Sequence, residues 1–120
     1  MRLTAFVAAL ALTLAPLPTL AQAQTTVTFE AVDSINLGFD LGPDKTVYGI
    51  EVTGIVQGET APRTILFHMS PSYYLYEYIG RACERQALMA MSKPGQYHLQ
   101  VRTTLVPNEL SGCSLRRNQP

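Results

Sequence analysis

The chain has 120 residues, with nine basic and nine acidic side chains, so its formal net charge is zero. A protein that grips nucleic acid normally presents a basic face that neutralises several phosphates, and this balance offers no such excess. We therefore expect no nucleic-acid partner. The length allows one small domain, and a domain of this size gains much from a covalent cross-link because it buries only about two thirds of its unfolded surface.

The first segment, residues 1–23, has the pattern of a secretory signal peptide. Arg2 supplies a positive charge, a largely apolar run extends from Ala5 to Ala15, and Ala21-Gln22-Ala23 places small residues before the cleavage point. The apolar run is too short to span a bilayer, and no later segment approaches about 18 consecutive apolar residues. We predict an exported protein, periplasmic or secreted, cleaved near Ala23 and without a membrane span in the mature chain.

Residues 24–120 are then expected to form a single domain, with eight basic and nine acidic residues and a net charge of −1. The two cysteines of this domain, Cys83 and Cys113, enter an oxidising compartment and are expected to pair. Closing the loop between them stabilises a domain by about 3 to 4 kcal/mol, because the unfolded chain loses entropy.

Alternation of apolar and polar residues predicts the strands before the helix. Such a pattern runs from Thr25 to Val32 and indicates a first strand. Asp33–Lys45 carries two glycines, a proline and three aspartates, which favours a long connection. A second strand is expected at Thr46–Val56, with Glu51 on its polar side, and a third at Arg63–Met69.

A helix is expected between Ser70, which suits the N-cap, and Pro94-Gly95, which ends it. The residues predicted to form its buried stripe are Leu75, Tyr78, Ile79, Ala82, Cys83, Gln86, Met89 and Ala90. Gly80 interrupts the helix at a cost of about 1 kcal/mol relative to alanine. We therefore expect a close contact at Gly80 that excludes a side chain.

Two strands follow the helix. Alternation over Tyr97–Thr104 predicts a fourth strand with His98 and Arg102 on its polar side, and a short last strand is expected around Gly112–Arg116. The predicted fold is therefore mainly β with one helix, in the order β-β-β-α-β-β.

This order of elements resembles the OB-fold, a small five-stranded Greek-key barrel, here with the helix between the third and fourth strands. The resemblance covers nearly the whole mature chain and rests on element order. An open α+β sandwich, with the helix on one face of the sheet, is the alternative. Cys83, on the edge of the buried helical stripe, would reach Cys113 in the last strand, so the expected disulfide would tie the helix to the barrel.

The densest unusual feature is a group of tyrosines at Tyr73, Tyr74, Tyr76 and Tyr78. Because each helical residue turns by about 100°, these rings cannot all face the core. Tyr78 belongs to the predicted buried stripe, so Tyr73, Tyr74 and Tyr76 are the expected binding residues. Exposed tyrosines suit recognition, since each offers a rigid apolar face with a polar tip.

A second candidate surface consists of the outward polar residues of the strands, Glu51, His68, His98 and Arg102. Neither histidine lies in a recognisable catalytic motif, and we assign no catalytic residue. A zinc site built from these histidines and Glu51 would lack a fourth ligand once the cysteines are paired. We expect neither a metal nor another cofactor.

The leading hypothesis is a secreted or periplasmic, non-enzymatic binding module for a protein or a glycan. Glycan-binding subunits of AB5 toxins resemble it in size and fold, which is an analogy of fold alone. The alternative is a small exported enzyme, or an enzyme inhibitor that inserts the loop Asp33–Lys45 or Leu105–Leu110 into a partner. An inhibitor would show a rigid, protruding segment, whereas a sheet-face binder would show a concave patch. Ligand and oligomeric state stay open.

Overall fold

The computed structural model describes residues 15, 24–70 and 74–119. In chain order these residues form β1 (Thr26–Leu41), β2 (Val47–Val56), β3 (Arg63–His68), α1 (Tyr74–Ser92), β4 (Tyr97–Thr103) and β5 (Leu110–Arg117). The predicted order of three strands, a helix and two strands is confirmed. The predicted signal peptide lies outside the described residues, apart from Ala15.

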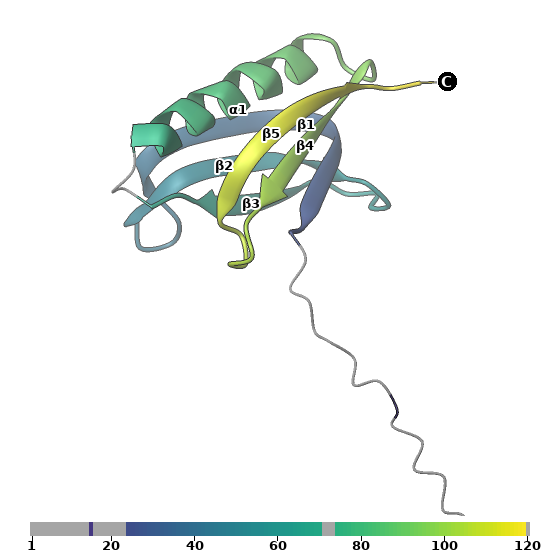
Figure 1. The fold of residues 1–120 in the computed structure, drawn as a ribbon. Coiled ribbons are helices and arrows are strands. Elements are labelled where there is room, and N and C mark those ends of the chain that lie inside the picture. The colour runs from purple at the N-terminus through teal and green to yellow at the C-terminus, as the bar shows by residue number, and fades with distance from the viewer. Residues whose placement is uncertain (1–14, 16–23, 71–73, 120) are drawn as a thin grey trace, which may run out of the picture.

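The strands form one antiparallel sheet in the order β3-β2-β1-β4-β5, and α1 lies across one face of it (Figure 1). The sheet is open. Its edge strands meet, within the described chain, at one isolated parallel bridge between His68 and Glu109. Of the two expected arrangements, the structure has the open α+β one, and the resemblance to the OB-fold stays a prediction.

β1 is longer than predicted. It continues into Asp33–Lys45, the expected connection, and ends only at Leu41. Its first residues pair with β4 and the later ones with β2. Hydrogen bonds to β2 outweigh the weak strand preference of the aspartates and glycine, and irregularities in the register let the strand bend. The connection shrinks to the turn Gly42–Lys45, whose end residues have φ values of 84° and 53°.

The core lies between α1 and the inner face of the sheet. Its largest fully buried side chains are Phe29, Phe67, Ile50, Leu99, Leu110, Val52, Val101 and Cys83. The rings of Phe29 and Phe67 meet edge to face, with centroids 6.5 Å apart. The buried hydroxyl of Thr103 donates to the carbonyl of Thr25 at 3.1 Å, so this polar group is satisfied at the rim of the core.

The face that α1 buries differs from the predicted one. The fully covered positions of the helix are Gly80, Cys83, Ala87 and Ala90. Tyr78 and Met89, both predicted to be buried, are 69% and 45% exposed. Cys83 and Ala90 are buried as predicted, whereas Tyr78 and Met89 are not, because close packing on the sheet requires small side chains at the contact and turns the larger ones outward.

Gly80 marks the closest approach of the helix to the sheet. A Cβ atom at this position would lie 2.8 Å from Cδ1 of Leu37 and 3.0 Å from Cε of Met69. Both distances are shorter than ordinary van der Waals contact. The expected contact at Gly80 is therefore confirmed, and its partners are a residue of β1 and the residue that follows β3.

The disulfide is also confirmed. Cys83 on α1 bonds to Cys113 on β5, with Cα atoms 5.1 Å apart and a sequence separation of 30 residues. The bond fastens the helix to an edge strand, which has a neighbouring strand on one side only.

β3 leaves the other edge of the sheet partly open. The N–H of His68 points away from β2 and donates to the carbonyl of Asn108, at 2.9 Å, in the loop between β4 and β5. Backbone groups of an antiparallel strand alternate between its two sides. The N–H groups of Thr64 and Leu66 therefore also point outward, along an edge that the loop covers only at its His68 end.

We predict that losing the disulfide lowers the free energy of unfolding by about 3 to 4 kcal/mol, because the closed loop restricts the unfolded chain. The test compares urea unfolding of the wild type with that of the double variant Cys83→Ala and Cys113→Ala. Reductant serves as control, since it should shift the wild-type midpoint and leave the double variant unchanged. If the urea midpoint of the wild type were the same with and without reductant, the prediction would be contradicted.

Gly80→Ala is predicted to give no gain in stability. Alanine improves helix propensity by about 1 kcal/mol, but its Cβ must displace the ends of Leu37 and Met69. The matched measurement repeats the substitution in a Leu37→Ala background, where space is available and a gain of several tenths of a kcal/mol is expected. If Gly80→Ala alone recovered the full propensity gain in thermal unfolding, the contact would have no energetic role.

Candidate functional site

A row of polar side chains follows the outer face of β4 and β5. Along β4, the alternation of the strand places Leu99 and Val101 in the core, while the residues between them face outward. The cross-strand partners of His98, Gln100 and Arg102 are Arg116, Ser114 and Gly112. We call His98, Gln100, Arg102, Ser114 and Arg116 the β4–β5 row.

Hydrogen bonds link the middle of the β4–β5 row. Nη1 of Arg102 donates to Oγ of Ser114 at 3.0 Å, and Oγ of Ser114 donates to Oε1 of Gln100 at 3.4 Å. The guanidinium of Arg102 thus has a fixed partner on the neighbouring strand, although its residue is exposed.

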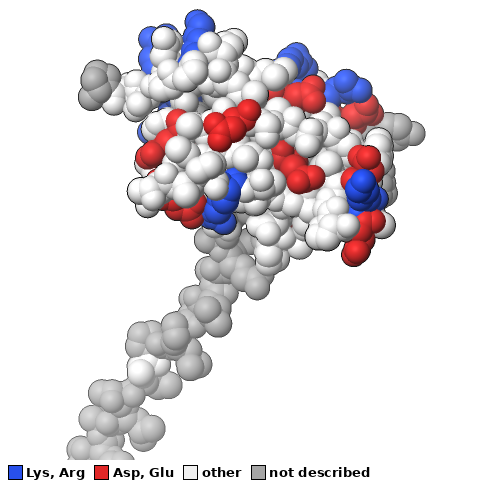
Figure 2. All heavy atoms as spheres, turned by 180° about the vertical axis from the view of Figure 1, so that it is seen from behind, with Lys and Arg blue, Asp and Glu red and all other residues white. Residues whose placement is uncertain are grey.

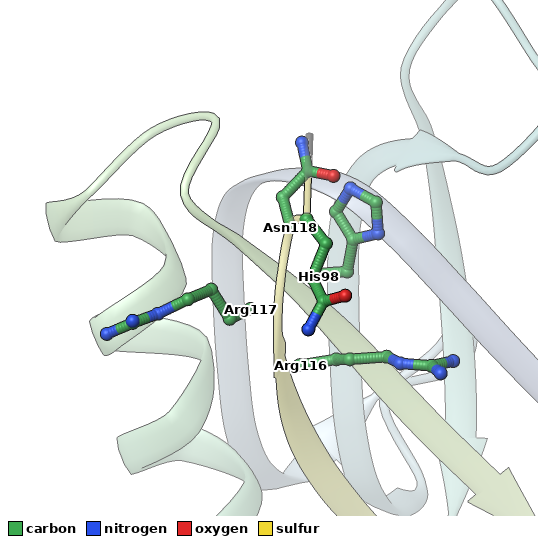
Figure 3. Close-up of a pocket in the computed structure, with 5 residues that line it drawn as sticks. His98, Arg116, Arg117 and Asn118 are labelled. Atoms are coloured by element: carbon green, nitrogen blue, oxygen red, sulfur yellow. The ribbon is translucent and has the colours of Figure 1, made fainter.

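A hollow of about 360 Å³ lies at the end of the row that His98 and Arg116 form. The residues that line it are His98, Arg116, Arg117, Asn118 and Gln119. Asn118 is tied down: its backbone N–H donates to the carbonyl of Gln96 at 2.8 Å, and Nδ2 donates to the carbonyl of Gly95 at 3.3 Å. Figure 3 shows the two arginines leaving opposite sides of β5, with Arg117 on the side of α1. The side chains of Arg116 and His98 therefore lie on the outer face of the sheet, away from α1.

The remaining predicted sheet-face residues lie apart from this row. Glu51 is on β2, between Asn36 of β1 and Leu66 of β3. His68 ends β3, and Nε2 of its ring lies 3.1 Å from the carbonyl of Pro107. His68 lies beside Glu109, just before β5, whereas His98 pairs with Arg116 near the other end of β5, so the structure does not bring the histidines together. Within the described residues no group of three or more His, Cys, Asp and Glu side chains is arranged for a metal ion.

A stacked aromatic pair, of which Phe39 is exposed and Tyr48 is partly buried, forms a second surface near the start of α1. Phe39 of β1 is 70% exposed and stacks on Tyr48 of β2, with ring centroids 4.1 Å apart and an interplanar angle of 16°. Burial raises the pKa of the Tyr48 phenol, the carboxylate of Glu77 raises it further, and the guanidinium of Arg81 lowers it. These two charged residues of α1 form an ion pair at 3.0 Å. Tyr48 of the aromatic pair is therefore close enough to α1 to feel the charges of these two residues.

The tyrosine group of the sequence points to the same end of the molecule. Tyr73 lies outside the described residues, and the side chains of Tyr74 and Tyr76, in the first turn of α1, lie outside the described part as well. Tyr78, one residue after Glu77, is exposed instead of buried. We call the stacked Phe39 and Tyr48 the aromatic end. Sequence reasoning missed Phe39 because its segment was expected to be a loop, although its alternation with Ile35 and Leu37 signals a strand.

The loop between β4 and β5 displays two exposed apolar side chains, Leu105 at 59% and Val106 at 49%. Hydrogen bonds brace it. Oγ1 of Thr104 donates to Oε1 of Glu109 and accepts from the N–H of Val106, each at 3.1 Å. The N–H of Glu109 donates to the carbonyl of Val106 at 3.1 Å. The loop thus has the fixed geometry expected of a segment that inserts into a partner.

Comparison with known protein families, with curated proteins and with solved structures found no significant match. Within the described residues no helix combines the length and apolar character needed to cross a membrane.

Proposed function

We propose that this protein is an exported binding module whose main contact surface is the aromatic end. The observation that carries the proposal is the stack of the exposed Phe39 ring on the partly buried Tyr48 ring. Isolated aromatic rings on a surface are held loosely, whereas a stacked pair offers a flat apolar face that loses little conformational entropy when a partner binds. Aromatic side chains of this kind are enriched among the residues that dominate binding energy.

Three further features support the proposal. The residues before Gln24 have the composition of a signal peptide. The Cys83–Cys113 bond suits an oxidising compartment, since disulfides are rare where thiols are kept reduced. Tyr78 adds a second exposed ring in α1, next to Glu77, whose charge acts on Tyr48.

Phe39→Ala and Tyr78→Ala are predicted to weaken partner binding at least about fivefold each while leaving the fold intact, because both side chains are exposed. The immobilised protein first captures its partner from a periplasmic or extracellular extract, and the purified partner is then titrated against each variant. Leu88→Ala is the matched control, since Leu88 is also an exposed apolar residue of α1. Equal affinity for all three variants and the wild type would remove the aromatic end as the contact surface.

An enzyme inhibitor that inserts the β4–β5 loop is the second candidate function, favoured by the braced, exposed Leu105 and Val106. The same titration separates the two proposals. If the aromatic end is the contact, Leu105→Ser and Val106→Ser are expected to bind like the wild type. Loss of binding in these loop variants, with Phe39→Ala unaffected, would establish the loop as the contact surface instead.

A further inference from the structure

Charge is divided unevenly along the fold. Residues 26–70, which contain β1 to β3, carry six acidic and two basic residues, a net charge of −4. Residues 74–119, which contain α1, β4 and β5, carry three acidic and six basic residues, a net charge of +3. Figure 2 shows one group of Lys and Arg at the upper left, while the other Lys and Arg of that face lie beside Asp and Glu. The near-zero total therefore conceals a basic side.

The β4–β5 row is the ordered part of this basic side. Its cations, Arg102 and Arg116, belong to neither of the ion pairs in the described chain, which join Arg63 to Glu59 and Arg81 to Glu77. Both guanidinium groups are thus available to an external anion. Arg102 comes four positions after His98, the cross-strand partner of Arg116, so the Cα atoms of the two cations lie about 13 Å apart along the strands.

The absence of a side chain at Gly112 leaves room for the guanidinium of Arg102 on β5. A Cβ atom there would lie 2.8 Å from Nη2 of Arg102. The guanidinium therefore lies across β5 at Gly112 while Nη1 donates to Ser114. This places the planar group along the sheet surface, where its remaining N–H groups can meet a ligand that runs over the strands.

The neighbours of the row are neutral. On β1, Thr26 and Thr28 are the cross-strand partners of Arg102 and Gln100. Glu30 lines a separate hollow together with residues from the end of α1. The carboxylate of Glu109 accepts a hydrogen bond from Thr104 inside the β4–β5 loop. Among the described residues, those that line the hollow at the end of the row are His98, two arginines, an asparagine and a glutamine.

We propose that the β4–β5 row binds an anionic polysaccharide. Arg102 and Arg116 hold sulfate or carboxylate groups of the chain, because a guanidinium matches the geometry of these oxyanions. Gln100 and Ser114, which lie between the two cations, hydrogen-bond sugar hydroxyls, since amide and hydroxyl groups both donate and accept.

The spacing favours a polysaccharide over a nucleic acid. A nucleic-acid strand carries a charge at every nucleotide, and proteins that bind single strands add aromatic platforms on which the bases stack. The β4–β5 row instead places neutral side chains between its cations and contains no Phe, Tyr or Trp. Alternation of charged and neutral groups suits a chain that alternates oxyanions with hydroxyls.

This proposal is independent of the aromatic end, because the two surfaces share no residue. Phe39→Ala should leave polysaccharide binding unchanged, and Arg102→Gln should leave capture of the partner described above unchanged. Failure of one proposal therefore leaves the other intact.

The experiment titrates the purified protein with a heparin hexasaccharide, a sulfated probe, at low and at physiological salt. Arg102→Gln and Arg116→Gln are each expected to weaken binding about tenfold, as loss of a charge-assisted hydrogen bond does. Gly112→Ala retains every charge but displaces the guanidinium of Arg102, and it should also weaken binding. Arg85→Gln is the control, since Arg85 is an exposed cation on α1 and its loss changes the net charge equally.

Binding that falls in the three row variants and persists in Arg85→Gln supports the proposal. Equal weakening by Arg85→Gln would overturn it, because attraction by net charge alone would explain the binding. Equal affinity for a single-stranded DNA oligonucleotide, lost in the same row variants, would also overturn it and assign the row to nucleic acid. Absence of binding to the hexasaccharide at low salt would overturn it outright.

Discussion

The close docking of α1 on the sheet is the contact on which the rest of the structure depends. At Gly80 the helix lies so near β1 that a methyl group would collide with Leu37, and one turn later Cys83 is bonded to β5. The helix therefore reaches both the middle strand and an edge strand of an open sheet. A small domain buries little surface on folding. The Cys83–Cys113 disulfide and the close contact at Gly80 therefore act together to hold the helix against the curved sheet.

Much of this fold is present in local sequence patterns. Alternation locates β2 and β4 almost to the residue, and Pro94-Gly95 marks the end of α1. The missed element, the second half of β1, is decided by pairing: the aspartates and Gly38 disfavour a strand, but β2 supplies a ladder for them. The buried face of α1 was found only in part, at Cys83 and Ala90, because the distance between helix and sheet is a property of packing that helical periodicity does not contain.

The residues of the candidate sites also fall into those that local sequence patterns predict and those that depend on how the strands pair. His98 and Arg102 could be placed on the outer face from alternation within one strand, and the structure adds their partners across the strands. Tyr78 of the tyrosine group was expected to be buried and is exposed. Phe39 stacks on Tyr48 and Arg116 pairs with His98, and such proximity is visible only after the strands have been put in order.

The open edge of β3 bears on whether molecules of this protein associate through their sheets. Outward amides on an edge strand can template growth of the sheet by strands of other molecules. Here the edge begins with the charged pair of Arg63 and Glu59 and ends where Asn108 caps His68. The stretch left between them is shorter than the six or seven residues that seed a cross-β fibril. The loop that displays Leu105 and Val106 thus also shortens the part of β3 on which a strand of another molecule could pair.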